Sequence, residues 1–245
     1  MKQKPVLILG ARSDIARAVA HRFAKAGYSI QLAARNSRSL SADKSDLELR
    51  YQVPVSVHEF DALEVETHIN FVDSLNKLPV IVVCAVGYMG TQPESEIDVI
   101  AARHVMRSNY EGPASVLAIL ANKFEHRGSG FLIGISSVAG ERGRASNYIY
   151  GSAKAGFTAF LSGLRNRLAK RGVHVITVLP GFVNTKMTEG MNLPSLLVVE
   201  PKDIADSIFH AVVAKKNIIY RKRIWMFIMM IIRNIPEYLF KRMKI

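Results

Sequence analysis

The sequence predicts an α/β fold in which helices cover both faces of a single parallel β-sheet. Short runs of Val, Ile and Leu alternate with longer helical patterns along the chain, from Val6–Leu9 to Ile218–Tyr220. These runs are continuously apolar, as strands buried on both faces are. Such alternation gives one doubly wound sheet, here of about seven strands, with right-handed crossovers.

The composition is that of one large globular domain. The chain has 245 residues, of which 49% are hydrophobic, enough to bury a substantial core. The single cysteine, Cys84, excludes an internal disulfide and suits a reducing compartment, so we predict a cytoplasmic protein. The basic residues before the first apolar run do not make a secretory signal, because that run is too short and no cleavage site follows it.

Positive charge is concentrated near the C-terminus. The chain holds 33 Lys and Arg against 20 Asp and Glu, a net charge of +13, and residues 215–245 hold nine of those cations with one acid, Glu237. Because the rest of the chain is only mildly basic, we expect no nucleic-acid partner. No spacing of His, Cys, Asp or Glu predicts a metal site.

The first predicted strand leads into a loop suited to a phosphate group. The strand ends at Gly10 and a helical pattern follows. A strand, a glycine and a helix capped by Ser13 or Asp14 form the phosphate-cradling unit of nucleotide-binding folds. The later glycines of that motif are replaced by Asp14 and an alanine. The Asp14 carboxylate would repel a pyrophosphate unless it turned back to cap the helix, and Arg12 could offset it.

The second predicted strand, Tyr28–Ala34, ends at Arg35. In dinucleotide-binding folds an acid here binds the adenosine ribose, whereas an arginine suits the 2′-phosphate of NADP. No acid occurs at residues 33–37. The sequence therefore favours NADP(H), with Arg12 or Arg38 as further phosphate ligands, and NAD(H) is the alternative.

The remaining elements alternate in the same way. We expect helices over 39–51, 64–75, 98–107, 113–124, 148–171 and 201–216, and strands over 53–60, 80–86, 131–135, 174–179 and 218–220. Residues that follow strands, among them Asp61, Gly87, Ser137 and Pro180, then meet at the carboxyl edge of the sheet, where ligands of such folds bind.

Tyr150 and Lys154 lie one helical turn apart. Because positions i and i+4 share a helix face, we expect the ammonium beside the phenol, where it lowers the tyrosine pKa from about 10. A phenol tuned in this way can exchange a proton with a carbonyl oxygen. Ser137, thirteen residues upstream at a strand end, can place its hydroxyl beside the phenol. The same spacing in isolation is that of an ordinary surface pair, so the interpretation depends on the surrounding fold.

Together the motifs resemble those of short-chain dehydrogenases/reductases over residues 4–220. In order they are Gly10 with Ile15, Asp61, Ala85-Val86-Gly87, Asn109, Ser137, Tyr150-x-x-x-Lys154 and Pro180-Gly181-x-Val183-x-Thr185. The resemblance implies a Rossmann-fold domain over residues 1–220 that reduces a ketone to a secondary alcohol with NAD(P)H.

The resemblance also implies a role for each residue. Tyr150 is the general acid in reduction, and Lys154 lowers its pKa and holds the nicotinamide ribose. Ser137 hydrogen-bonds the substrate oxygen, and Asn109 fixes a water that links Lys154 to bulk solvent. Asp61 meets the adenine, and Val183 and Thr185 meet the carboxamide. The implied cofactor-binding residues are Gly10, Arg12, Ser13, Asp14, Ile15, Arg35, Asp61, Ala85, Val86, Gly87, Tyr150, Lys154, Pro180, Gly181, Val183 and Thr185.

Two segments depart from the family pattern. The glycine loop holds Asp14, and the run Cys84–Gly87 replaces the usual Asn-Asn-Ala-Gly. Both affect cofactor affinity more than proton transfer. A non-catalytic dinucleotide-binding sensor is the alternative class of protein, although such members commonly lose the tyrosine or the lysine, and both are present.

Residues 221–245 form a basic and apolar tail after the predicted domain. Its apolar run, Ile224–Ile232, is flanked by arginines and is too short to cross a bilayer, which needs about 20 residues. We expect a second short helix capped by Asn234, with Pro236 in its first turn. The composition is that of an in-plane interfacial helix, and packing on the domain or on a partner subunit is the alternative.

The tail and the run Ser136–Lys154 are similar to those of decaprenylphosphoryl-2-keto-ribose reductases. This similarity implies a polyprenyl-phosphate-linked 2-keto-pentose made by a partner oxidase, and peripheral contact with the inner face of the membrane. A soluble carbonyl or 3-oxoacyl compound is the alternative substrate. Family members mostly pair through the long helices at 113–124 and 150–170, so we expect a homodimer or homotetramer.

Overall fold

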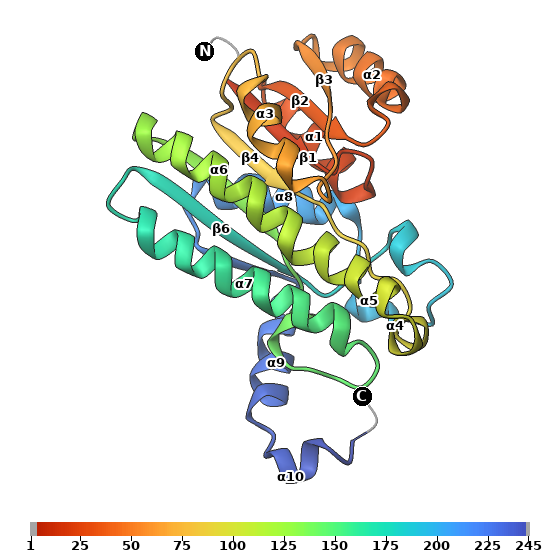
Figure 1. Ribbon diagram of the computed structural model, residues 1–245. Helices are drawn as coiled ribbons and strands as arrows, with labels where there is room; N and C mark the ends of the chain where they lie inside the picture. The colour runs from red at the N-terminus through yellow and green to blue at the C-terminus, as the bar shows by residue number, and fades with distance from the viewer. Residues whose placement is uncertain (1–3, 244–245) are drawn as a thin grey trace.

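Seven parallel strands form the central sheet of the computed structural model, which describes residues 4–243. The strands are β1 (Pro5–Leu9), β2 (Ser29–Ala34), β3 (Val55–Glu59), β4 (Ile81–Cys84), β5 (Gly130–Ile135), β6 (Val173–Pro180) and β9 (Ile218–Arg221). Their order across the sheet is β3-β2-β1-β4-β5-β6-β9, and every neighbouring pair is parallel. This arrangement confirms the predicted doubly wound sheet (Figure 1).

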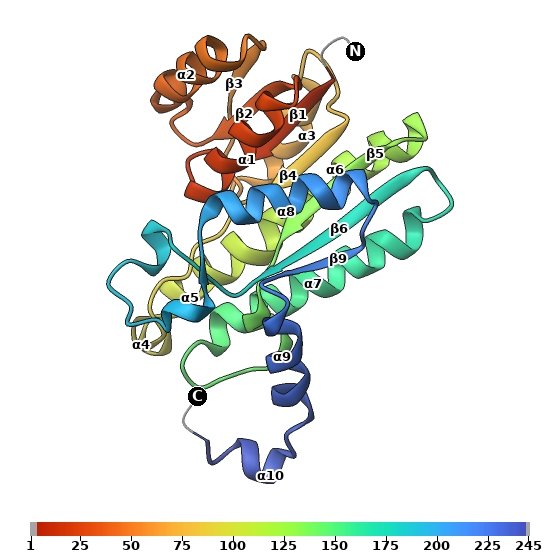
Figure 2. The ribbon, with the colours of Figure 1, turned by 180° about the vertical axis from the view of Figure 1, so that it is seen from behind.

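Helices cover both faces of the sheet. They are α1 (Asp14–Lys25), α2 (Ser41–Tyr51), α3 (His68–Asp73), α4 (Gln92–Ile97), α5 (Val99–Met106), α6 (Gly112–Arg127), α7 (Tyr148–Leu168), α8 (Pro201–Val213), α9 (Ile224–Asn234) and α10 (Glu237–Phe240). One core cluster joins α1, α2 and α8 to one face of the sheet. The other joins α3, α6 and α7 to the opposite face. Figures 1 and 2 show these two layers from opposite sides.

The alternation of side chains along the strands explains how both faces are filled. Val6 and Ile8 of β1 enter one core cluster, and Leu7 and Leu9 enter the other. All four side chains are fully buried, because successive strand residues point to opposite faces. The continuous apolar run that predicted a central strand thus serves two helical layers.

A short second sheet and the tail lie beyond the carboxyl ends of the strands. β7 (Phe182–Val183) pairs with β8 (Val198–Val199), and residues 184–197 connect them. After β9 the chain forms α9 and α10, which project from the domain (Figures 1 and 2). No helix within residues 4–243 is long and apolar enough to cross a membrane.

The structure corrects two expectations about helices. Residues 107–111 form a π-helical turn that joins α5 to α6, so Asn109 lies within a helical path. Asn234 does not cap α10: it ends α9, and its Nδ2 donates to the Met230 carbonyl at 2.7 Å. An asparagine side chain can bond the backbone of its own last turn as readily as that of a following helix.

Candidate active site

Tyr150 and Lys154 occupy successive turns at the start of α7. Lys154 is only 3% exposed. Its Nζ lies 5.7 Å from the centre of the Tyr150 ring and donates to the Ile135 carbonyl at 3.0 Å. The lysine is thus held by the end of β5, at the predicted edge of the sheet.

Ser137 follows β5 and faces the same helix. Its Oγ accepts a hydrogen bond from the Ala139 amide at 3.1 Å and so begins a short 3₁₀ turn, Val138–Glu141. That turn packs closely against α7: a Cβ added to Gly140 would lie only 2.6 Å from the Ala155 backbone nitrogen. Ser136, one residue earlier, donates its hydroxyl to the Lys154 carbonyl at 3.0 Å. The strand end and the helix are therefore fixed to each other.

Burial dominates the ionisation of this pair. It raises the pKa of Tyr150 to about 12, an effect that hydrogen bonding from Ser137 partly offsets. Burial also lowers the pKa of Lys154 to about 8. The direction of the Tyr150 pKa shift is opposite to the one expected from the sequence, because burial of the phenol is its largest cause, while the Lys154 ammonium donates to the Ile135 carbonyl. The phenol therefore keeps its proton at neutral pH, as a proton donor must.

Asn109 completes the group from the π-helical turn. Its side chain is fully buried, and Nδ2 donates to the carbonyls of Tyr88 and Val105. Its Oδ1 is buried and has no partner among the described residues. A Cβ added to Gly87 would lie 3.1 Å from this oxygen and 3.5 Å from the Lys154 Nζ. A buried acceptor left open beside an ammonium suits a bridging water.

The glycine loop after β1 approaches the end of β4 closely. Gly10 has φ +78°, and a Cβ there would lie 3.0 Å from the Ala85 carbonyl group and from the Val86 nitrogen. Only glycine fits without strain. Ser13 caps α1, since its Oγ accepts from the Ala16 amide at 3.2 Å, and Ile15 packs against the core. Arg12 is exposed beside the loop.

Asp14 does not cap α1. Its Oδ2 accepts a hydrogen bond from the Lys186 backbone amide at 3.0 Å, which joins the start of α1 to the segment after β7. The carboxylate that we expected either to oppose a pyrophosphate or to cap the helix is engaged by an amide 172 residues away.

The ends of β2 and β3 form the next part of the edge. Arg35 is exposed after β2. The adjoining turn is held by Glu59, whose two carboxylate oxygens accept from the amides of Asn36 and Ser37, each at 2.7 Å. This pair of bonds lowers the pKa of the Glu59 carboxyl. The strand-end arginine thus sits on a fixed turn and faces solvent, where an anion could reach it.

Asp61 is fixed by a histidine that the sequence did not single out. The Asp61 carboxylate accepts from the Leu63 amide at 2.9 Å. His68 is fully buried between the Asp61 carbonyl and the Ser115 hydroxyl, with ring nitrogens 3.1 Å from each. An isolated histidine in a helical pattern carries no signal of such a contact.

The segment after β6 carries the last expected cofactor residues. Pro180 ends β6 and Val183 is buried in β7, whereas Thr185 caps the 3₁₀ turn Lys186–Thr188. Gly181 lies under the indole of Trp225: a Cβ there would meet ring atoms at 2.0 Å. The tail and the expected carboxamide-binding segment are thus in direct contact.

The tail also contacts the turn that follows Ser137. Trp225 and Met229 of α9 are buried with Val138 and Leu179. Arg142 donates to the Arg233 carbonyl at 3.1 Å and to the Glu237 carboxylate at 2.6 Å, and its guanidinium lies 4.1 Å from the centre of the Phe240 ring. Nothing in the tail sequence located these contacts, because each joins segments about 90 residues apart.

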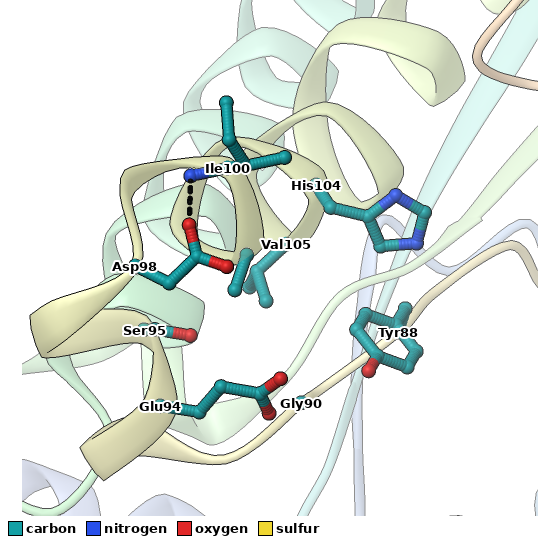
Figure 3. Close-up of a pocket in the computed structure, with 9 residues that line it drawn as sticks. Tyr88, Gly90, Glu94, Ser95, Asp98, Ile100, His104 and Val105 are labelled. Carbon is teal, nitrogen blue, oxygen red and sulfur yellow. Dashed lines mark hydrogen bonds between the residues drawn. The ribbon is translucent and has the colours of Figure 1, made fainter.

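A cavity of about 270 Å³ lies beside the Tyr88 backbone. Figure 3 shows Glu94 and His104 directed toward the Tyr88 ring, while the Asp98 carboxylate turns back to the Ile100 amide. The Tyr88 and His104 rings lie edge to face with centres 4.9 Å apart. Because the Tyr88 carbonyl also supports Asn109, this cavity adjoins the group formed by Asn109, Tyr150 and Lys154.

The residues present fit a dinucleotide. The Gly10 backbone passes close to the end of β4 just before the N-terminus of α1, the place where such folds bind a phosphate, and an exposed arginine follows β2. Asp61, Gly87 and Ser137 follow β3, β4 and β5, whose carboxyl ends lie at the same edge of the sheet. The structure thus brings all the sequence-predicted strand-end residues to one side of the sheet.

Comparison with known proteins agrees with this geometry. A family model described as short chain dehydrogenase matches residues 4–194. An uncharacterized oxidoreductase of Mycobacterium tuberculosis (strain ATCC 25618 / H37Rv) is 37% identical over 242 residues, covering 98% of this chain and 96% of that protein. An uncharacterized oxidoreductase of Streptomyces coelicolor is 30% identical over 244 residues, covering 98% and 96%.

Solved structures share the fold. A short chain dehydrogenase from Burkholderia cenocepacia J2315 in complex with NADP has a TM-score of 0.83 at 21% identity, covering 98% of this chain and 97% of that one. A short-chain dehydrogenase from Sphingobium yanoikuyae in complex with NADPH has a TM-score of 0.81 at 22% identity, covering 95% and 96%.

Proposed function

The chain belongs to the short-chain dehydrogenase family, and from that premise we propose that it reduces a ketone to a secondary alcohol with NADPH. The observation that carries the proposal is the joint position of four side chains. Asn109, Ser137, Tyr150 and Lys154 come from three separate elements and gather at the carboxyl ends of β4 and β5. A dinucleotide-binding sensor would not need this set.

Each of the four side chains has a place in the reaction. The nicotinamide cofactor, when bound, supplies the hydride to the carbonyl carbon. Ser137 donates a hydrogen bond to the carbonyl oxygen, and Tyr150, protonated at neutral pH, gives that oxygen its proton. Lys154 and a water on the open Asn109 Oδ1 return a proton to the phenol from solvent.

NADP(H) is the proposed cofactor. Arg35 is exposed after β2 on the turn that Glu59 holds, and Arg12 is exposed after β1. A guanidinium at the first of these places suits a 2′-phosphate. Two structural relatives contain NADP or NADPH, which supports the same choice for this chain.

The proposed substrate is a 2-keto-pentose linked to a polyprenyl phosphate, reduced at the cytoplasmic surface of the membrane. Large apolar side chains are exposed on the segment and helix near the site: Leu196 is 84% exposed, Phe227 52% and Ile231 64%. They lie among the cations of the tail. Apolar residues ringed by Lys and Arg favour contact with an anionic lipid surface, where such a substrate would be presented.

A homodimer or homotetramer is the proposed assembly, through the outer faces of α6 and α7. These helices are long and lie side by side on one face of the sheet, running in the same direction (Figure 1). Neither the reaction nor the membrane contact requires a second subunit, so the assembly is tested separately by sedimentation.

Tyr150→Phe tests the reaction. With a cyclic ketone panel and the 2-keto-pentose phosphodiester, we expect NADPH consumption to fall about 10²- to 10⁴-fold, the range for one general acid. NADPH binding, followed by its fluorescence, should stay nearly unchanged. Tyr148 is an exposed tyrosine two positions before Tyr150 on the same helix. Tyr148→Phe is therefore the matched control and should keep full activity. Equal activity in wild type and Tyr150→Phe would reject the mechanism.

A further inference from the structure

The loop between Ser137 and Tyr150 carries two arginines with different surroundings. Arg142 is fully engaged by the tail, through Glu237, the Arg233 carbonyl and the Phe240 ring. The Arg144 side chain makes no hydrogen bond or ion pair within residues 4–243, although its Nε is shielded from solvent. Burial lowers the pKa of the Arg144 guanidinium. Keeping a shielded cation without an anionic partner costs folding free energy. A bound anion would remove this cost.

The same turn holds an unused acceptor. The Asn147 amide donates to the Arg144 carbonyl at 3.0 Å, which places the two residues in one turn just before α7. The Asn147 Oδ1 is buried and unpartnered. A guanidinium and an amide oxygen together offer donors for an anion and an acceptor for a hydroxyl. Arg144 lies six residues and Asn147 three residues before the proposed proton donor, Tyr150.

We propose that Arg144 binds the phosphate group of the substrate and that Asn147 accepts a hydrogen bond from a sugar hydroxyl. The inference rests on the proposed function and adds the recognition of one anionic group to it. In a 2-keto-pentosyl phosphodiester, only the anomeric carbon and its oxygen separate the carbonyl carbon from the phosphorus. An enzyme that places the carbonyl beside Ser137 and Tyr150 must therefore accommodate the phosphate close by.

The other cations near this loop already have partners. Lys154 bonds the Ile135 carbonyl, Arg233 bonds Glu141, and Arg221 bonds Asp203. Of the two arginines in residues 138–147, Arg144 is the one whose side chain has no partner within residues 4–243. A planar guanidinium can bind two phosphate oxygens at once, which gives both affinity and orientation.

Glu141 is the rival partner inside the protein. Its Oε1 accepts from Tyr220 at 2.8 Å and from Arg233 at 3.3 Å, but its Oε2 is buried without a partner. If Arg144 existed to neutralise Glu141, then removing either group would have the same effect on every substrate. If Arg144 binds phosphate, its removal should raise KM only for the substrate that carries the phosphate. Removal of the Glu141 carboxylate should not distinguish the two substrates.

The experiment compares two ketones that differ in the phosphate. One is the 2-keto-pentofuranosyl phosphodiester of a short isoprenyl alcohol, and the other is the methyl glycoside of the same 2-keto-pentose. For Arg144→Gln we expect KM for the phosphodiester to rise about 10- to 100-fold, as for a lost charge-assisted hydrogen bond. KM for the methyl glycoside should stay within about two-fold, and Arg144→Lys should fall between.

Two control variants and a binding measurement separate the outcomes. Arg142→Gln and Glu141→Gln should leave the ratio of the two KM values unchanged. Calorimetry with the reduced phosphodiester should show the same loss of affinity for Arg144→Gln in the NADPH-saturated protein. Equal KM changes for both ketones, or a Glu141→Gln variant that reproduces the effect, would overturn the inference and leave the proposed reductase standing.

Failure of the proposed function gives a different pattern. If the wild type consumes NADPH with neither ketone, the reductase proposal fails, and calorimetry alone then decides the inference. Retained affinity for the phosphodiester in Arg144→Gln would refute a phosphate site at this arginine, and a loss specific to Arg144 would support it.

Discussion

The proposed catalytic floor and the proposed substrate rim are built in opposite ways. The floor is Asn109, Ser137, Tyr150 and Lys154, of which all but the tyrosine are at most 9% exposed. The rim is the segment 184–197 with α9 and α10, where large apolar side chains face solvent. The floor is fixed by short-range turns and strand ends, whereas contacts between distant parts of the chain fix the rim.

This difference separates chemistry from selectivity. Proton transfer needs groups held in one geometry, which strand ends and the first turns of α7 supply. Substrate choice needs a surface that can differ between relatives of one fold. The two regions meet at Gly181 and Val138, which contact Trp225. Changes at that contact should reveal whether the rim also supports the floor.

Trp225→Ala should have the largest effect on stability. The indole is 4% exposed and packs on Gly181 and on the Phe182 ring, with ring centres 5.2 Å apart. Removing a buried tryptophan costs about 3–5 kcal/mol, measured as the free energy of unfolding in urea. Trp225→Phe should lower the free energy of unfolding by less than Trp225→Ala does. An unchanged free energy for Trp225→Ala would show that the tail is not part of the folded core.

Phe227→Gln with Ile231→Gln should have the next largest effect, on membrane binding. The two residues lie one turn apart on the exposed side of α9. Burying such side chains in a lipid surface contributes about 1 kcal/mol or more each, so partitioning into phosphatidylglycerol vesicles should fall roughly 30- to 100-fold.

A matched pair of exposed residues controls for hydrophobicity alone. Leu49→Gln with Ile69→Gln changes residues that are 79% and 58% exposed on α2 and α3. This variant should float with vesicles as the wild type does. Equal flotation of all three proteins would show that the exposed rim residues do not bind the membrane.

The fold and the floor were predictable because their signals are local. Continuous apolar runs gave the strands, and i, i+4 spacing placed Lys154 on the helix face of Tyr150. Gly10 after the first apolar run predicted the strand–glycine–helix unit, and the structure adds its close approach to the end of β4. The roles assigned to these residues stay predictions until variants are measured.

The contacts that the sequence missed all join distant segments. His68 joins the Asp61 carbonyl to the Ser115 hydroxyl, which lies 47 residues further along the chain, and Trp225 covers Gly181. The direction of the Tyr150 pKa shift was also missed, since it depends on how fully protein encloses the phenol. Periodicity describes which face of an element is apolar, but not which other element covers it.

Lys154→Met should change how stability depends on pH. The unfolded chain keeps a proton on this amine up to about pH 10.4, whereas the folded protein releases it near pH 8. Between these values the unfolded state binds more protons, so the free energy of unfolding rises with pH.

The expected rise for the wild type is roughly 2 kcal/mol between pH 8 and pH 10. Lys154→Met should lack it, and Lys170→Met, at an exposed lysine, should keep it. Tyr150, with its pKa raised to about 12, lowers stability only as pH rises above about 10. Parallel urea titrations of the three proteins provide the measurement, and an identical pH dependence would mean that Lys154 is not desolvated.

Asp14→Gly should have the smallest effect and is the most direct test of how the rim is tied to the cofactor loop. The variant restores the glycine of the family pattern but removes the bond from the Lys186 amide to the Asp14 carboxylate. Losing one such bond costs about 0.5–1.5 kcal/mol, so KM for the ketone should rise about 3- to 10-fold as the segment 184–197 loosens.

The affinity for NADPH separates the two roles that Asp14 can have. Removing a carboxylate from the start of α1 takes a negative charge away from the proposed phosphate site, so NADPH should bind Asp14→Gly at least as tightly as the wild type. Asp14→Asn keeps an acceptor oxygen and should retain the wild-type KM. Weaker NADPH binding with an unchanged KM in Asp14→Gly would assign Asp14 to the cofactor instead, and the rim would then be independent of the loop that holds the phosphates.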